Sequence, residues 1–207
     1  MKEAPHRLAT WNGSYQFFQA EKQTAKEQGR SVYDICNELV ASTNPKESGI
    51  VFLPFLYGSN AGMDAKSCLV GMASHHTRAD VLRAIYEGVV FAHMTHMDNL
   101  KSFRKMPETI RLTGGAARSE VWLQIFADVF QTTVEIPDGT ELGALGAAIA
   151  AGVGCGCFED YPQAIDIMVS FSKRVEPNPA MKALYEEKYA KYKKVIATLD
   201  PIWKELA

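Results

Sequence analysis

Residues 109–137 decide the fold, and they read TIRLTGGAARSEVWLQIFADVFQTTVEIP. The alternating run at the start of this stretch predicts a strand, and Gly114 and Gly115 then turn the chain. Ser119 can cap the apolar helix that follows it. A second strand is expected to stop at Pro137, because proline cannot donate a hydrogen bond to the next strand. Strand, helix and strand in this order indicate an α/β fold.

The sequence on both sides of this stretch continues the alternation of helices and strands. Before it, we expect two helical pieces over 17–40 separated at Gly29, a buried strand from residue 50 that ends at Pro54, and a strand over 68–72. A long and mostly buried helix should then begin at a cap formed by Thr77 and Asp80. After it, we expect a small-residue helix over 141–154 and an amphipathic helix that Asn178 and Pro179 open. The alanines and glycines of the 141–154 helix allow close backbone packing. The whole chain is interpreted as one domain-sized unit.

Composition limits the function classes. The chain has 207 residues, of which 47% are hydrophobic, and a formal net charge of -2. Its charge gives no field that would attract nucleic acid or an anionic membrane, and no apolar run reaches the length of a membrane span. The cysteines lack CxxC spacing, which predicts reduced and buried thiols at Cys36, Cys68, Cys155 and Cys157. We therefore expect a cytoplasmic protein that binds a small molecule, with no nucleic-acid or membrane partner.

The turn at Gly114 and Gly115 is the candidate ligand site. Glycines leave room for a ligand at the backbone, and the start of the next helix offers unpaired N–H groups, an arrangement that suits a nucleotide. A valine at Gly115 is expected to abolish binding, because its side chain would fill the ligand's space and disfavour a positive φ. The alternative is that the glycines only reverse the chain, since the sequence has neither a P-loop nor a GxGxxG turn after a strand.

Four motifs follow one another along the chain. They are PFLYG at 54–58, SCLVGM at 67–72 with DVLRAIYE at 80–87, TGGAARS at 113–119, and ELGALGAA at 141–148. In order and spacing this set resembles the C-terminal domain of the FGGY family of carbohydrate kinases. The stretches FLPFLYGSN and YEGVVFAHMTHM are similar to the L-xylulose kinase branch of that family.

The resemblance implies a fold and a site. The fold would be a ribonuclease-H-like (actin-like ATPase) C-terminal half over residues 16–207, lacking its first strands and therefore leaving an open, apolar sheet edge. The site would bind ATP or ADP, with Mg²⁺ in the complete enzyme. Its nucleotide contacts would come from Gly114, Gly115, Ala116 and Ser119, the last at a position where relatives often carry Asn.

No residue of this chain is expected to be catalytic. Glu87, Asp128 and Glu141 match family positions, and we interpret them as structural residues that fix helix ends around the cleft. The resemblance places the catalytic aspartate, a phosphate-binding loop and the sugar-binding domain upstream, so a ketose would reach the site through that missing part. No metal site is predicted, because no further ligands are placed near His93 and His96. The sequence leaves assembly into homo-oligomers open.

Residues 1–15 are interpreted as an atypical N-terminal segment. Relatives carry a stretch resembling NLEWF at about this place, whereas residues 6–15 read HRLATWNGSY. Codons allowed for that peptide encode the NLEWF stretch when they are read two bases later. The hypothesis is a shifted reading frame, either in the remnant of a broken kinase gene or as a sequencing artefact.

Three functions remain open from the sequence. The chain can be part of an ATP-dependent kinase for a ketopentose such as L-xylulose, inactive by itself for lack of the catalytic aspartate. It can be a nucleotide-binding fragment without catalysis. The third hypothesis is a non-functional product of a disrupted gene.

Overall fold

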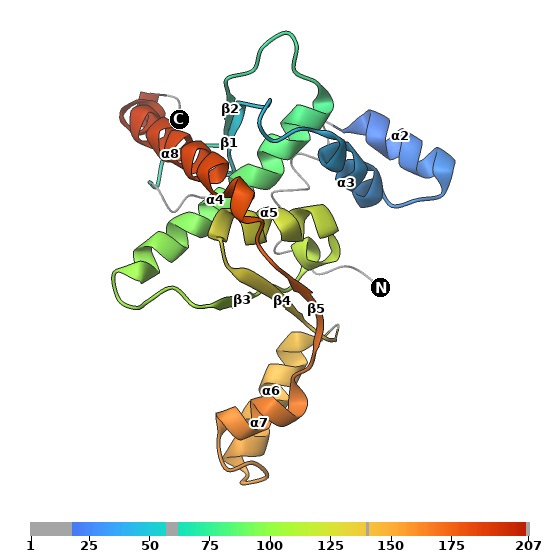
Figure 1. The fold of residues 1–207 in the computed structure, drawn as a ribbon, viewed down its shortest axis with the longest axis vertical. Helices are drawn as coiled ribbons and strands as arrows, with labels where there is room; N and C mark the ends of the chain where they lie inside the picture. The colour runs from blue at the N-terminus through green and yellow to red at the C-terminus, as the bar shows by residue number, and fades with distance from the viewer. Residues whose placement is uncertain (1–17, 57–61, 140, 206–207) are drawn as a thin grey trace.

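The structure, a computed structural model, describes residues 18–56, 62–139 and 141–205 (Figure 1). The interpretation of residues 1–15, and Tyr57 and Gly58 of the PFLYG motif, lie outside these ranges. In chain order the elements are α2 (Gln19–Gln28), α3 (Val32–Ser42), β1 (Val51–Leu53), β2 (Cys68–Val70), α4 (Arg78–Lys101), β3 (Thr109–Arg111), the 3₁₀ turn η1 (Gly115–Arg118), α5 (Glu120–Phe130), β4 (Thr133–Pro137), α6 (Leu142–Gly154), α7 (Tyr161–Met168), β5 (Phe171–Val175), η2 (Pro179–Met181), α8 (Lys182–Leu199) and η3 (Asp200–Glu205).

The described strands form two small sheets, which makes the fold mixed α/β as predicted. In the first sheet β1 pairs antiparallel with β2, and Val51 lies opposite Val70. In the second, β4 is central: it runs parallel to β3 and antiparallel to β5. Leu69 and Val70 of β2 are exposed, and the open, apolar edge left by missing first strands stays a prediction.

The stretch 109–137 folds as its sequence predicts. Strand β3 leads through η1 into α5, and α5 returns the chain to β4, the parallel neighbour of β3. The Ser119 side chain caps α5 by accepting a hydrogen bond from the Trp122 backbone N–H. Strand β4 ends at Pro137. These residues therefore build one β–α–β unit, with the Gly114–Gly115 turn at the carboxyl end of β3.

Other local signals are also confirmed, and some elements were missed. The helix break lies at Gly29, whose φ is +63°, and Thr77 with Asp80 forms a complete capping box at the start of α4. Helix α7 and strand β5 have no counterpart in the sequence prediction. Strand β5 reads FSKRV, and its polar central residues are typical of a loop. The segment is a strand because it pairs with β4.

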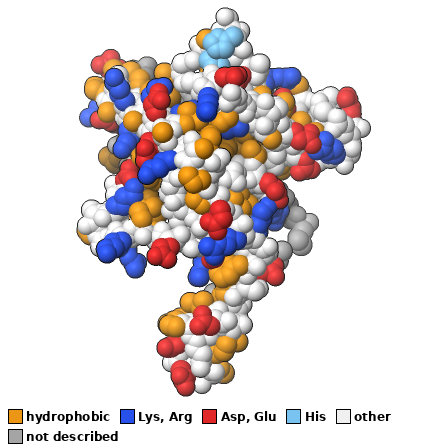
Figure 2. All heavy atoms as spheres, viewed as in Figure 1, with side chains coloured by type: hydrophobic (Ala, Val, Ile, Leu, Met, Phe, Trp, Pro, Cys, Tyr) orange, Lys and Arg blue, Asp and Glu red, His pale blue; other side chains and the backbone are white. Residues whose placement is uncertain are grey.

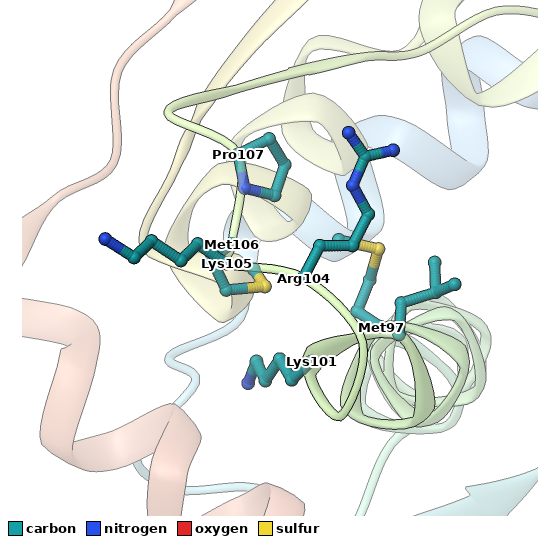
Figure 3. Close-up of a pocket in the computed structure, with 7 residues that line it drawn as sticks. Met97, Lys101, Arg104, Lys105, Met106 and Pro107 are labelled. Carbon is teal, nitrogen blue, oxygen red and sulfur yellow. The ribbon is translucent and has the colours of Figure 1, made fainter.

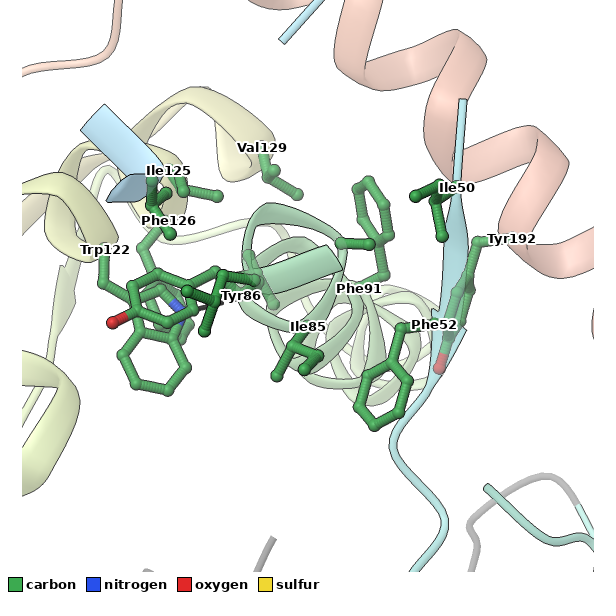
Figure 4. Packing of buried hydrophobic residues seen from close by; sticks show 14 of the residues in the cluster. Ile50, Phe52, Ile85, Tyr86, Phe91, Trp122, Ile125, Phe126, Val129 and Tyr192 are labelled. Atoms are coloured by element: carbon green, nitrogen blue, oxygen red, sulfur yellow. Dashed lines mark hydrogen bonds between the residues drawn. The ribbon is translucent and has the colours of Figure 1, made fainter. Parts of the chain in front are cut away.

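Helix α4 is the centre of the core, with α5 on one side and β1 and α8 on the other (Figure 4). Tyr86 of α4 stacks on Trp122 of α5, with ring centroids 4.4 Å apart. Phe91 of α4 lies near Tyr192 of α8, at 5.5 Å between centroids. Phe52 of β1 is buried in the same cluster. Burial of these apolar and aromatic side chains is the main favourable contribution to folding.

The backbones of α4 and β1 touch at Gly88. A side chain at this position would put its first carbon 2.3 Å from the Phe52 carbonyl oxygen, far inside contact distance. Only the missing side chain of glycine lets the helix approach the strand this closely. Gly88 is thus a packing requirement within an otherwise regular helix.

A buried ionic cluster joins α3, α4 and α8. The Glu87 carboxylate, 2% exposed, accepts a hydrogen bond from Lys188 Nζ at 2.6 Å and pairs with Arg83 Nη1 at 3.4 Å. Arg83 also donates from Nη2 to the Val40 carbonyl oxygen at 2.8 Å, near the end of α3. Burial lowers the pKa of Lys188, and the neighbouring Glu87 carboxylate acts against that shift. Glu87 therefore serves as the anion that two buried cations share.

Helix α6 is less packed than its composition suggests. It packs against α7, and the two helices project from the three-stranded sheet (Figure 1). Ile149 is its only fully buried described residue, and a carbon added at Gly143 or Gly146 would meet nothing within 4 Å. The close contact that small residues allow is found at Gly152, against the Phe158 ring. Within the described ranges, no helix has the length and apolar character to cross a membrane.

The prediction that every cysteine is buried is wrong for two of them. Cys36 is buried and Cys68 is half-buried, but Cys155 and Cys157 are exposed. The physical reason is their place at the end of α6, which packs mainly against α7 among the elements that the structure describes. All four are free thiols.

Gly88→Ala is expected to destabilise the protein by about 2 kcal/mol, because the new methyl group must push α4 away from β1. Urea unfolding followed by circular dichroism measures this. Gly143→Ala is the matched control: it is also a helical glycine, but it has open space around it and should gain up to about 1 kcal/mol from helix propensity. Equal effects of the two substitutions would contradict the close approach.

Glu87→Gln is expected to cost about 3 kcal/mol, because it leaves Arg83 and Lys188 buried without their shared anion. The control is Glu187→Gln, which removes an exposed ion pair with Lys191 and should cost less than about 0.5 kcal/mol. The free energies of unfolding of both variants are compared with that of the unmodified chain. A loss for Glu87→Gln no larger than that of the control would show that the cluster does not stabilise the fold.

Candidate functional site

The predicted site is an exposed turn at the carboxyl end of β3. Thr113, Gly114 and Gly115 are exposed, and Ala116 is half-buried. The turn lies between β3 and α5 of the β–α–β unit, and in open α/β sheets ligands bind beyond the carboxyl ends of the strands. The turn is therefore accessible to a ligand and stands in a suitable place for one.

One expectation about this turn is wrong. The positive φ belongs to Gly114, at +85°, whereas Gly115 begins the 3₁₀ turn and is not among the glycines with positive φ. A carbon added at Gly114 would meet nothing within 4 Å, so glycine is needed there for its backbone conformation and not for lack of space. A valine at Gly115 would therefore act through its bulk alone.

Two backbone N–H groups of the turn precede its first internal hydrogen bond. That bond runs from the Ala117 N–H to the Gly114 carbonyl oxygen at 3.2 Å, and a second one joins the Ser119 N–H to the Ala116 carbonyl oxygen at 3.1 Å. The N–H groups of Gly115 and Ala116 consequently have no acceptor within the turn, as at the start of any helix. Backbone N–H groups at the start of a helix are the kind of donor that binds anionic groups.

Ser119 is buried, unlike the exposed glycines of the turn, and it has a different role. It is 5% exposed, its Oγ donates to Asn37 Oδ1 at 2.7 Å, and it accepts from the Trp122 N–H at 3.2 Å. Protein groups thus already use the hydroxyl as donor and as acceptor. The structure places Gly114, Gly115 and Ala116 at the surface. Ser119 instead stabilises the start of α5.

Asn37 of α3 is a site-positioning residue that the sequence analysis missed. Its Oδ1 accepts hydrogen bonds from Ser119 and from the Tyr86 hydroxyl, the latter at 2.8 Å. Trp122 adds a bond from Nε1 to the Tyr86 carbonyl oxygen at 3.2 Å. Burial raises the pKa of Tyr86, which keeps its hydroxyl protonated as a donor. No local signal could have identified Asn37, because its partners lie far along the chain.

The acidic residues that match family positions have different surroundings. Asp128 is buried, and its Oδ1 accepts from the Asn178 N–H at 2.7 Å and from Gln124 Nε2 at 2.9 Å, which holds the chain entering η2 against α5. Asp128 thus lies near the end of α5, whereas Glu87 lies in the middle of α4 and not at a helix end as interpreted from the sequence. Glu141 stands at the first position before α6 and is exposed, without a capping hydrogen bond from its side chain.

Two hollows lie on the surface of the described residues. One of about 300 Å³ lies where α4 ends (Figure 3) and is lined by Met97, Leu100, Lys101, Arg104, Lys105, Met106 and Pro107. Figure 2 shows Lys and Arg side chains interspersed with Asp and Glu over the visible face of the molecule. A smaller hollow of about 120 Å³ lies beside Glu87 and Lys188. Neither hollow includes a residue of the Gly114–Gly115 turn.

The described residues offer no metal centre. No three His, Cys, Asp or Glu side chains among them are grouped so that they could hold an ion. His75 and His76 lie side by side, with ring centroids 4.2 Å apart, and His76 Nδ1 accepts from the Ala73 N–H. His93 lies against the Phe126 ring at 5.7 Å.

Known proteins resemble this chain in sequence. Residues 7–155 match the FGGY family of carbohydrate kinases, C-terminal domain. The L-xylulose/3-keto-L-gulonate kinase of Escherichia coli (strain K12) is 41% identical over 192 residues, which are 92% of this chain and 37% of that protein. The chain thus spans little more than a third of the length of this relative.

Solved structures resemble it in fold. The crystal structure of xylulose kinase from Rhodospirillum rubrum has a TM-score of 0.78 at 28% identity, over 89% of this chain and 37% of that one. The structure of Plasmodium falciparum glycerol kinase with ADP has a TM-score of 0.68 at 20% identity, over 89% and 37%, and shows likeness of fold alone. The chain therefore belongs to the FGGY family of carbohydrate kinases and corresponds to their C-terminal, actin-like ATPase domain.

Proposed function

We propose that this chain supplies the nucleotide-binding side of an ATP-dependent kinase that phosphorylates a ketopentose such as L-xylulose. The observation that carries the proposal is the exposed Gly114–Gly115 turn, in which the N–H groups of Gly115 and Ala116 have no acceptor within the turn itself. The name of the Escherichia coli relative supports the sugar class, and the glycerol kinase structure with ADP supports the nucleotide.

The proposed role of the turn is to bind and orient the nucleotide. Phosphoryl transfer depends mainly on positioning and on stabilisation of charge, with a carboxylate to accept the proton of the sugar hydroxyl. The N–H groups of Gly115 and Ala116 would hold polar or anionic groups of ADP, and Ser119 would keep α5 and the turn in place through Asn37. Mg²⁺ would neutralise phosphate charge, arriving bound to the nucleotide.

The isolated chain is proposed to be inactive. The buried acidic residues Glu87 and Asp128 are already engaged, the first with Lys188 and Arg83 and the second with the Asn178 N–H. Neither is free to accept a proton from a sugar hydroxyl. A nucleotide-binding fragment without catalysis is the second candidate, and the open turn favours it equally.

Two measurements on the purified chain test this proposal. Mg-ADP at about one hundred times its Kd should raise the thermal midpoint by about 5 °C, because it binds only the folded state. Phosphate transfer to L-xylulose and to D-xylulose should be undetectable. Turnover by the chain alone would refute its inactivity, and an unchanged thermal midpoint would refute nucleotide binding by this domain.

Gly114→Val and Gly115→Val should each abolish the rise in thermal midpoint with Mg-ADP, the first by distorting the turn and the second by filling the ligand's space. Gly29→Val is the matched control, because Gly29 also has a positive φ and open space but ends α2. Gly114→Val and Gly29→Val, the two variants at positions with positive φ, should each lose about 1 kcal/mol of stability. Only the control should keep its response to ADP, and a response kept by both turn variants would remove the turn from the site.

A further inference from the structure

Two exposed thiols stand together at the end of α6. The Sγ atoms of Cys155 and Cys157 are 3.2 Å apart, and both cysteines are exposed and free. They lie outside the proposed nucleotide site, at the tip of the projecting pair α6 and α7 (Figure 1). Reaction with a small molecule from solution requires this kind of exposure.

The cap of α6 holds the two cysteines in this arrangement. Cys155 is the capping residue, and Gly156 follows with φ +77°. The Gly156 N–H bonds to the Val153 carbonyl oxygen at 3.2 Å, and the Cys157 N–H bonds to the Gly152 carbonyl oxygen at 2.8 Å. These two bonds with a left-handed glycine between them define a Schellman motif. The reversal of the chain at Gly156 turns the second cysteine back toward the first.

A ring contact reinforces this cap. A carbon added at Gly152 would lie 2.6 Å from the Phe158 ring, so that ring lies directly on the helix backbone next to the thiols. The chain on both sides of Gly156 is therefore fixed, by hydrogen bonds on one side and by the ring on the other. The backbone that carries both cysteines is therefore held in the arrangement in which their Sγ atoms lie 3.2 Å apart.

The other cysteines lack these properties. Cys36 is fully buried, and burial raises its pKa to about 12, so almost no thiolate is present near neutral pH. Burial also raises the pKa of Cys68. In contrast, hydrogen bonds from the Cys157 thiol and N–H lower the pKa of Cys155. No third metal-binding side chain joins the pair within the described ranges, so the pair is suited to sulfur chemistry and not to a metal centre.

We propose that Cys155, Gly156 and Cys157 form a thiol–disulfide exchange site that low-molecular-weight disulfides oxidise reversibly. The Cys155 thiolate attacks one sulfur of glutathione disulfide, and one glutathione thiolate leaves. The Cys157 thiolate then attacks the Cys155 sulfur, which forms the intrachain bond and releases the second glutathione. Two protons and two electrons pass from the cysteines to the glutathione pair. An exposed disulfide of this kind is easily reduced again, which makes the site reversible.

The test uses the full chain, reduced and then equilibrated with glutathione and glutathione disulfide near neutral pH. Acid quenching, alkylation of the remaining thiols and mass spectrometry of peptides identify the products. The peptide with residues 155–157 should lose two hydrogen atoms and escape alkylation, and dithiothreitol should reverse both changes. Cys36 and Cys68 should remain alkylatable after unfolding. Glutathione adducts on that peptide without ring closure, or no reaction there, would overturn the proposal.

Variants separate the role of the cap from that of the thiols. Cys155→Ser and Cys157→Ser should each stop at a mixed disulfide with glutathione on the remaining cysteine. Gly156→Ala keeps both thiols but disfavours the positive φ, and the rate of ring closure should fall about tenfold. Gly154→Ala is the matched control, with open space and no positive φ, and should close at the original rate. Equally fast closure in Gly156→Ala would show that the cap does not create the site.

Discussion

The contact between the backbone of α4 at Gly88 and the Phe52 carbonyl oxygen is the constraint on which the arrangement depends. It sets how closely the central helix lies against β1, and therefore where the other face of α4 stands. That face carries Tyr86, which stacks on Trp122 and positions α5. Because interiors are packed at nearly crystalline density, a shift at Gly88 would be transmitted through these rings.

The Gly114–Gly115 turn is exposed, and it leads into α5, whose start is held by polar bonds. Asn37 ties α3 to α4 and α5 through Tyr86 and Ser119, so the start of α5 has a fixed position. Since the turn leads directly into α5, the position of the Gly115 and Ala116 N–H groups depends on the position of that helix. Contacts within this chain therefore fix the start of α5, although the chain spans only 37% of its Escherichia coli relative.

Local chemistry explains which features the sequence could predict. The elements of the stretch 109–137 could be predicted because Gly114, Ser119 and Pro137 determine local structure: a turn, a helix cap and a strand end. The partner of Ser119 could not be predicted, because Asn37 lies 82 positions away and only the packing of α3 against α5 brings it there. The same limit applies to β5, whose polar centre becomes a strand only by pairing with β4. The exposure of Cys155 depends on what covers α6, which composition does not reveal.

The projection of α6 and α7 has a consequence for the stability of the chain. These helices bury little apolar surface outside their own pair, and the polypeptide enters them after β4 and leaves them before β5. Regions with so few tertiary contacts open as separate cooperative units, at a lower free energy than global unfolding. Amide hydrogens of α6 should therefore exchange with solvent through fluctuations confined to this lobe, while those of α4 exchange only when the whole domain melts.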